Sequence, residues 1–245
     1  MSQAIDVILG YFESNQLLIW IIVQFGFVIL FIANAYRIFI KQNPYSIMTH
    51  SISFLGSWIP TRNPKGWWNL SIALIILGVL FFPLILYYHR YMALISVWAA
   101  YIGTILLIVG IIGIILVAVF PDNEGMDFFR DLSYGKVHNT VAVLGFGGFG
   151  FGNLWFGLMF IYDAAWGEHI YNPIRFLPPY IGLFILVGII GYTQWKWEKI
   201  WRADETKKGF PGEGVYSFPL WEWILATYLF LAVYYVLLSF PPGLS

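Results

Sequence analysis

The stretch SVWAAYIGTILLIVGIIGIILVAVF, residues 96–120, contains no charged side chain. A helix needs about 20 apolar residues to cross a hydrocarbon core of about 30 Å. A single strand or a loop cannot cross, because its backbone N–H and C=O groups would stay unpaired in lipid. Residues 96–120 therefore predict a transmembrane helix.

Five further apolar stretches lie on either side of this segment along the chain. The six predicted spans cover residues 17–40, 70–88, 96–120, 140–162, 180–197 and 220–240. The sequence has neither a strong internal repeat nor a Pro/Gly-rich linker, so we expect one domain over residues 1–245. The expected fold class is all-α, a polytopic integral membrane protein formed by a bundle of about six transmembrane helices.

The overall composition also favours lipid as the surrounding medium. The 245 residues are 60% hydrophobic and 11% charged, with a mean hydropathy of +0.74. A soluble domain carries about 25% charged residues, because its surface must face water. The 20% of aromatic residues fit a membrane protein, since Trp and Tyr favour the headgroup level of a bilayer.

Several classes of cofactor and partner are excluded by the residues present. The net charge is zero, so we expect no nucleic-acid partner. The chain has no cysteine, which excludes iron–sulfur clusters and thiolate metal sites. None of the four histidines lies in the middle of a predicted span, which excludes a transmembrane b-type haem.

The distribution of Lys and Arg predicts the orientation of the chain. Six spans place the 41–69, 121–139 and 195–219 loops on one face, and only Arg90 and Arg175 among the 13 Lys and Arg belong to the other face. The positive-inside rule then makes the long loops cytoplasmic and puts both termini outside. The eleven basic residues of the first face are Arg37, Lys41, Arg62, Lys65, Arg130, Lys136, Lys196, Lys199, Arg202, Lys207 and Lys208.

Three side chains at the predicted cytoplasmic interface form a candidate catalytic or metal-binding cluster: His50, Asp122 and His138. Two imidazoles and a carboxylate can hold a divalent metal, or a histidine can act as a general base. The other interpretation is structural, with Asp122 capping its loop and the histidines bonded to backbone carbonyls. Four nearby polar residues are candidates to join the cluster: Ser51, Ser53, Asn63 and Asn139.

Other polar and small residues fall inside or beside the predicted spans. Glu222 begins the last span, where an acid is a functional candidate by default, although the Trp residues on either side of it also fit an interfacial position. Gly145, Gly148 and Gly152 share one side of the fourth helix and predict close helix packing; a pore or a lipid slot is the alternative. Bonds across helices are expected from Gln24, Asn34 and Asn153.

The end of the fifth span alternates aromatic and basic residues. This pattern is typical of a helix end seated among lipid headgroups, where each Lys or Arg contributes about 1 kcal/mol near anionic lipid. The predicted lipid-interface residues are Trp195, Lys196, Trp197, Lys199, Trp201 and Arg202.

Short motifs carry a resemblance to a known family. Ile52, Ser53, Leu55 and Gly56 match an IS-x-LG segment before the second span, and FPD at 120–122 precedes His138 at the start of the fourth. The layout resembles the prokaryotic six-helix membrane proteins of the domain-of-unknown-function family 998, which are distantly similar to the eukaryotic Frag/DRAM/Sfk group. The acid directly follows the proline here, a small departure from the expected motif. The eukaryotic group is linked to lipid-anchor remodelling and phosphoinositide control, so the resemblance implies a role with lipids.

Three functional hypotheses follow. The first is lipid binding, or modification of a lipid headgroup, at the cytoplasmic interface, with membrane lipids as partners and a divalent metal as the cofactor to test for. The second is a non-catalytic accessory subunit, which would have a membrane protein partner or form a homo-oligomer. The third is a small-solute transporter. The sequence lacks the clear inverted repeat that is common in such proteins, which makes this hypothesis the weakest of the three.

Overall fold

Six long helices dominate the computed structural model, which describes residues 7, 10–12, 16–122, 127–129, 132–204 and 214–241. All six are long and apolar enough to cross a membrane. The predicted all-α, six-span fold is therefore confirmed. The helices are α2 (Leu17–Phe39), α4 (Trp67–Ile95), α5 (Val97–Val119), α6 (Tyr134–Ala165), α7 (Pro173–Ala203) and α8 (Phe218–Ser239).

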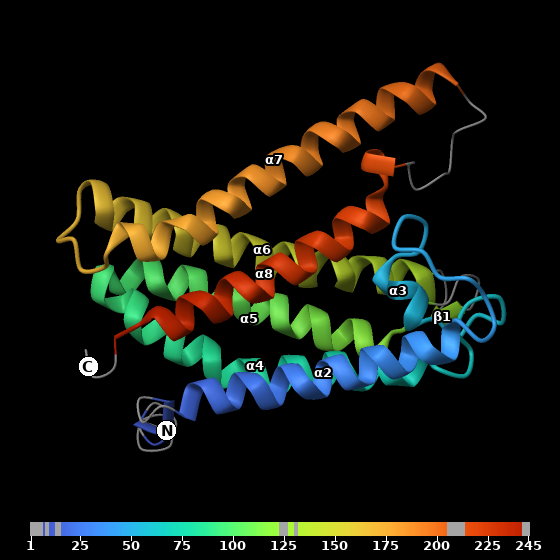
Figure 1. The fold of residues 1–245 in the computed structure, drawn as a ribbon, viewed down its shortest axis with the longest axis horizontal. Coiled ribbons are helices and arrows are strands. Elements are labelled where there is room, and N and C mark those ends of the chain that lie inside the picture. Colours follow the sequence, from blue (N-terminus) through green and yellow to red (C-terminus); the bar gives the residue numbers. More distant parts are fainter. Residues whose placement is uncertain are drawn as a thin grey trace.

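Short elements lie between the long helices at one end of the bundle. They are α3 (Ile52–Leu55), the antiparallel strands β1 (Asp127–Phe129) and β2 (Leu132–Ser133), and the 3-10 turn η3 (Gly214–Tyr216). This end is called the loop end below (Figure 1). It contains the last residues of α2, α5 and α7 and the first residues of α4, α6 and α8. The other end, where α2 begins and α8 ends, is called the terminal end.

Several helices extend beyond the apolar runs from which they were predicted. α4 continues through the polar residues His89 and Arg90 as far as Ile95, and α7 begins at Pro173 and includes Pro178 and Pro179. Helix starts are set by capping: Asn172 and Ser217 accept hydrogen bonds from the backbone N–H groups of Ile174 and Leu220. Hydropathy therefore located the apolar segments, whereas side-chain caps mark the starts of α5, α7 and α8.

A close contact between α5 and α6 is the densest packing between helices. A Cβ at Gly110 would lie 2.2 Å from the backbone N of Phe149, and one at Gly113 would lie 2.3 Å from the backbone N of Gly145. Gly148 and Gly152 face α5 in the same way. Small residues let two helix backbones approach until van der Waals contacts replace lipid. The glycines of α5 and α6 thus join the two helices into one rigid unit.

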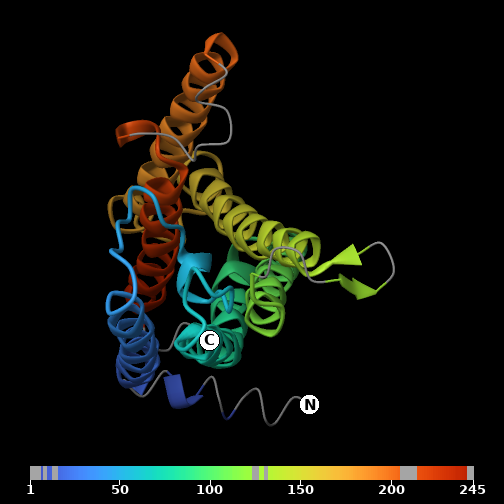
Figure 2. The ribbon, with the colours of Figure 1, turned by 90° about the vertical axis from the view of Figure 1, so that its right-hand side faces the viewer.

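At the loop end, the short helix α3 lies among the ends of the long helices. Viewed from the loop end, α2, α4, α5, α6 and α8 form a ring with α3 inside it, and α7 extends away from the bundle (Figure 2). α2 packs on α4, and α8 packs chiefly along α7. Gln24 Nε2 donates to Leu77 O at 2.9 Å and Asn34 Nδ2 to Asn69 Oδ1 at 2.7 Å, so both predicted bonds across helices are confirmed.

The prediction of a bond across helices is wrong for Asn153. Its Nδ2 donates to Phe149 O, one turn earlier in α6, at 2.8 Å. The side chain therefore bonds within its own helix. Gly148 and Gly152, which precede it in α6, leave so little space beside α5 that backbone, rather than a long polar side chain, fills that part of the interface.

Asn63 anchors the loop that carries α3. Its side chain is fully buried, and its Nδ2 donates to Ala35 O at 3.2 Å and to Leu55 O at 2.8 Å. These bonds join the last part of α2, the end of α3 and the residues before α4. One amide group thereby holds the 40–66 loop against the loop end of the bundle.

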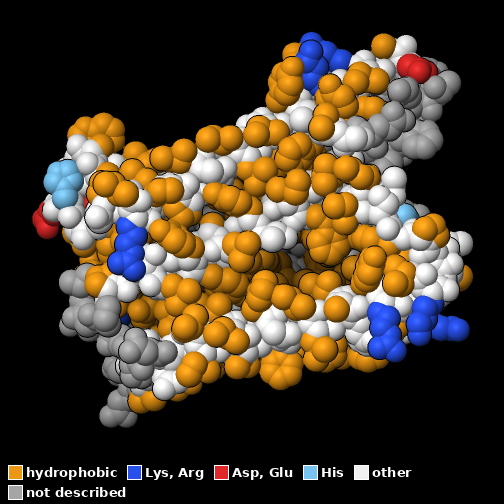
Figure 3. Space-filling view, viewed as in Figure 1, with side chains coloured by type: hydrophobic (Ala, Val, Ile, Leu, Met, Phe, Trp, Pro, Cys, Tyr) orange, Lys and Arg blue, Asp and Glu red, His pale blue; other side chains and the backbone are white. Residues whose placement is uncertain are grey.

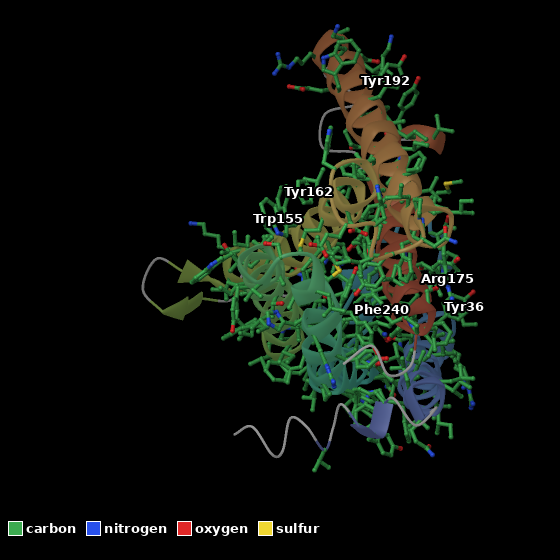
Figure 4. All side chains as sticks on the ribbon, turned by 90° about the vertical axis from the view of Figure 1, so that its left-hand side faces the viewer. Tyr36, Trp155, Tyr162, Arg175, Tyr192 and Phe240 are labelled. Atoms are coloured by element: carbon green, nitrogen blue, oxygen red, sulfur yellow. The ribbon has the colours of Figure 1, made fainter. Side chains whose placement is uncertain are left out.

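The terminal end is closed by aromatic rings. Phe240 lies at the centre of this end (Figure 4), stacked on Tyr91 with ring centroids 4.3 Å apart. Phe176 and Tyr171 pack against the same ring at 5.4 and 5.6 Å. The terminal end is therefore filled by side chains.

Replacing Gly148 with alanine is expected to destabilise the protein by about 1–3 kcal/mol, because overpacking has this cost in a close-packed interior. The new Cβ would lie 2.6 Å from the backbone N of Gly110, and a backbone cannot move aside cheaply. Thermal unfolding in detergent micelles measures the effect. Gly147→Ala, on the same helix with nothing within 4 Å of its Cβ, is the matched control and should melt no lower than the unchanged protein. Equal melting temperatures for both variants would contradict the packing described here.

Replacing Asn63 with alanine is expected to destabilise the protein by about 1–3 kcal/mol, the usual cost of losing buried hydrogen bonds. Chemical unfolding in micelles measures this loss. Gln42→Ala is the control in the same loop, because the Gln42 side chain is exposed and its amide donates a long hydrogen bond, 3.4 Å, to Ile38 O. Its effect should stay within about 0.5 kcal/mol. A similar cost for both variants would show that Asn63 does not anchor the loop.

Candidate functional site

His138 lies at the start of α6 with its imidazole ring held by a backbone carbonyl. The ring is 5% exposed, and Nδ1 lies 2.8 Å from the carbonyl oxygen of Phe120. A carbonyl oxygen can only accept, so Nδ1 carries a proton. In the neutral ring Nε2 is then an acceptor. The carbonyl orients His138 in the way that a carboxylate orients a general base.

His50 belongs to a compact turn before α3. Its Nδ1 lies 2.9 Å from Thr49 Oγ1 and 3.2 Å from the backbone N and O of Ser46. Its ring stacks on Tyr45 at 5.2 Å and meets Phe54 edge-on at 4.9 Å. The imidazole of His50 therefore stabilises this turn.

Asp122 links the end of α5 to the loop that carries α3. Its carboxylate forms an ion pair with Arg62, and its backbone oxygen accepts a 2.8 Å hydrogen bond from Ser57 Oγ. The Arg62 guanidinium also lies over the Phe54 ring, 4.2 Å from its centroid. Asp122 is thereby an anchor for the loop.

The three side chains of the predicted cluster therefore have separate partners. Among the residues that the structure describes, no group of three His, Asp or Glu side chains is close enough to hold a metal ion. The structure does not bring His50, Asp122 and His138 together as a metal site. The arrangement of His50 and His138 matches the structural interpretation, because Nδ1 of each ring lies within hydrogen-bond distance of a backbone carbonyl oxygen, Ser46 O for His50 and Phe120 O for His138.

His138 instead faces a cavity of about 590 Å³ between α4, α5, α6 and α8, called cavity A. This volume is in the range of about 300–1,000 Å³ that is usual for small-molecule sites. Its polar lining lies mostly at the loop end, and its apolar walls run along the helices. The polar lining residues are Thr49, Ser51, Ser53, Ser71, His138, Asn139 and Glu222, and the apolar walls include Leu70, Leu74, Leu77, Ile114, Val117, Phe146, Phe149 and Phe230.

A second cavity, called cavity B, lies on the other side of α8, between α2, α4 and α8. It has a volume of about 770 Å³, and the molecular surface is hollowed between α8 and α2 (Figure 3). Along α2 its walls run from Tyr36 to Phe25, which is about 16 Å at the helical rise of 1.5 Å per residue. The residues that line both cavities are Ile52, Leu70, Leu74, Leu77, Ala226 and Phe230.

Glu222 stands on the side of cavity A, in the first turns of α8. Its Oε2 accepts a hydrogen bond from the backbone N–H of Ile52 at 3.3 Å. The carboxyl group thus caps the start of α3, where the first N–H groups have no partner within the helix. Glu222 is the acid that joins α3 to α8.

Trp223 and Ser217 add further bonds between α8 and the loop. Trp223 Nε1 donates to Tyr45 Oη at 2.9 Å and lies 3.3 Å from His50 O, and Ser217 Oγ donates to Met48 O. Burial raises the pKa of the Tyr45 hydroxyl far above its ordinary value, and the Trp223 hydrogen bond opposes this shift. Tyr45 therefore stays neutral and can donate its proton to His50 O at 3.1 Å.

The predicted lipid-interface residues lie in the last turns of α7, and they differ in their surroundings. Trp195 is exposed, and Lys199 Nζ lies 3.7 Å from its ring centroid, while Arg202 pairs with Glu198. Trp197 is 7% exposed and stacks on Tyr216 of η3, so it packs against protein. The Trp201 side chain, Arg130, Lys207 and Lys208 lie outside the described residues.

Sequence reasoning missed the bonds that tie α8 to the loop. Tyr45 and Trp223 are 178 positions apart, and no local pattern links them. It also missed Asp163, which is 1% exposed and accepts hydrogen bonds from Ile170 N and Tyr171 N at the terminal end. The one available signal was an acid inside an apolar helix four residues before Gly167.

Comparison with known proteins places the chain in a family. A family model described as "Protein of unknown function (DUF998)" matches residues 25–240. No curated protein and no solved structure matches the chain. The matched range contains every residue that lines cavities A and B. The chain belongs to this family of multi-pass membrane proteins of unknown function.

Proposed function

We propose that this protein binds an amphiphilic lipid in the two cavities beside α8, with the lipid's polar head at the loop end. The observation that carries the proposal is the polarity gradient of cavity A, whose hydroxyl, imidazole and carboxyl groups lie at the loop end of apolar walls. An amphiphile has the same division into a polar head and a hydrocarbon tail.

The position of the cavities within the bundle supports a lipid over a water-soluble ligand. Both are walled by transmembrane helices, so a ligand with an alkyl chain can enter from the bilayer without crossing water. Cavities A and B share six lining residues on α3, α4 and α8 and therefore adjoin. Two adjoining apolar slots suit a lipid with two chains.

His138 gives this site one group capable of chemistry on the lipid head. The Phe120 carbonyl fixes the imidazole ring of His138, and Nε2 can accept a proton from a hydroxyl within hydrogen-bond reach. Headgroup modification would use His138 as that base, without His50 or Asp122. Binding is the main proposal, and modification is its extension.

The proposed orientation puts the loop end in the cytoplasm. Of the 13 Lys and Arg, eleven belong to the loops and helix ends of this face, and the positive-inside rule favours that side for them. The lipid head would then lie in the cytoplasmic leaflet. Basic side chains at the loop end, such as Lys199 in the last turns of α7, would contact anionic headgroups of the surrounding bilayer.

Filling either cavity should remove bound lipid from the purified protein. Ala142→Phe adds a ring in cavity A and Ala33→Phe adds one in cavity B, and each should weaken lipid binding about tenfold, or by about 1.4 kcal/mol. Native mass spectrometry after mild detergent extraction counts the lipid that remains. Ala165→Phe, on an exposed part of α6 outside both cavities, is the control and should retain lipid as the unchanged protein does. Equal retention by all variants, or none by the unchanged protein, would contradict the proposal.

Labelling of single introduced cysteines tests the orientation, since the chain has no cysteine of its own. Thr61 and Glu168 are both exposed and lie at opposite ends of the bundle. In intact cells a membrane-impermeant maleimide should label Glu168→Cys and leave Thr61→Cys unlabelled until the cells are permeabilised. The reverse pattern would place the loop end outside.

A further inference from the structure

At the polar end of cavity A, His138 and Glu222 present hydrogen-bond acceptors to a ligand, and the neighbouring Ser, Thr and Asn side chains can both donate and accept. His138 Nδ1 is bonded to Phe120 O, so Nε2 of the neutral ring is an acceptor. Glu222 uses Oε2 for the Ile52 N–H, and its second carboxyl oxygen can accept another hydrogen bond. Ser51 Oγ and Ser53 Oγ lie 2.6 Å apart and share one hydrogen bond, which leaves lone pairs on both.

The charge of this end is negative or neutral. Glu222 is the one residue with a formal charge in the described lining of cavity A, and that lining contains no Lys or Arg. Arg62, a basic residue of the loop that carries α3, forms an ion pair with Asp122. An anionic head placed here would be buried beside an acidic side chain, with no Lys or Arg in the described lining to offset its charge.

We infer that cavity A selects a lipid whose head is an uncharged hydroxyl, of the diacylglycerol or long-chain alcohol type, and rejects lipids with a phosphate head. The inference rests on the proposed lipid binding and specifies the chemistry of the head. A hydroxyl donates its proton to Glu222 or to His138 Nε2 and accepts from Ser51 or Ser53. A phosphate monoester would place anionic oxygens against the acceptors of Glu222 and His138. Selection here thus combines attraction for one head with repulsion of the other.

Three lipids with the same two chains test the inference on the full-length protein. They are dioleoylglycerol, dioleoyl phosphatidic acid and dioleoyl trimethylammonium propane, which has a positive charge but no donor hydrogen. Titration in detergent micelles, followed by native mass spectrometry, gives the relative affinities. Dioleoylglycerol should bind at least about tenfold more tightly than either of the others, which is about 1.4 kcal/mol. Ala142→Phe should abolish this preference, since it fills cavity A.

Each other result overturns a defined part of the account. If phosphatidic acid binds cavity A as tightly as dioleoylglycerol, the inference fails and the proposed lipid binding stands. If the trimethylammonium lipid binds most tightly, Glu222 acts through its charge. The inference then fails, and the proposed lipid binding stands. If none of the three lipids binds, the proposed function fails with it.

Substitution of Glu222 provides an independent check. Glu222→Lys should reverse the selection and favour phosphatidic acid by about tenfold. Glu222→Gln keeps an oxygen for the Ile52 N–H and removes the acidic group. It should therefore reduce the ratio of dioleoylglycerol affinity to phosphatidic acid affinity, a result that does not depend on whether the lysine variant folds. Glu168→Lys makes the same charge change at an exposed site at the terminal end and should leave the preference unchanged. An unaltered preference in Glu222→Gln would show that the carboxyl group does not set the selection.

Discussion

The attachment of α8 at its two ends determines where this protein has space for a ligand. At the loop end, Glu222 and Trp223 bond to the segment around α3. At the terminal end, Phe240 packs among the rings of Tyr91, Tyr171 and Phe176. Between these anchors α8 packs chiefly along α7 and contacts α2 and α6 less, on its other faces. Cavities A and B occupy those faces.

The glycine contact between α5 and α6 supplies the rigid wall of cavity A. Because Gly110 and Gly113 leave no space beside Phe149 and Gly145, these two helices cannot separate without losing close packing. The same contact places the start of α6 beside the end of α5, where the Phe120 carbonyl meets His138. A packing feature of the mid-membrane region therefore positions a polar group at the interface.

The fold was predictable from the sequence, whereas the arrangement of the site was only partly so. An uninterrupted apolar run such as residues 96–120 satisfies its backbone hydrogen bonds in lipid by forming a helix. The number and class of the spanning elements therefore followed from composition and spacing. His138 and Glu222 were singled out as titratable groups at an interface, and both line cavity A. Hydropathy, however, contains no information about which loop residue meets which helix. The bond between Tyr45 and Trp223 and the separation of His50 and Asp122 from His138 depend on tertiary packing of a 27-residue loop, from 40 to 66. Helix ends such as Pro173 were missed because they are set by caps outside the apolar run.

A density map of the protein, extracted with its native lipid into nanodiscs and with no lipid added, would show whether a lipid occupies the cavities beside α8. We expect elongated density in cavities A and B, on both sides of α8, that ends in a compact feature within hydrogen-bond distance of Glu222 or His138. Cavities closed by movement of α8 against α4, or filled by neighbouring side chains, would contradict this expectation.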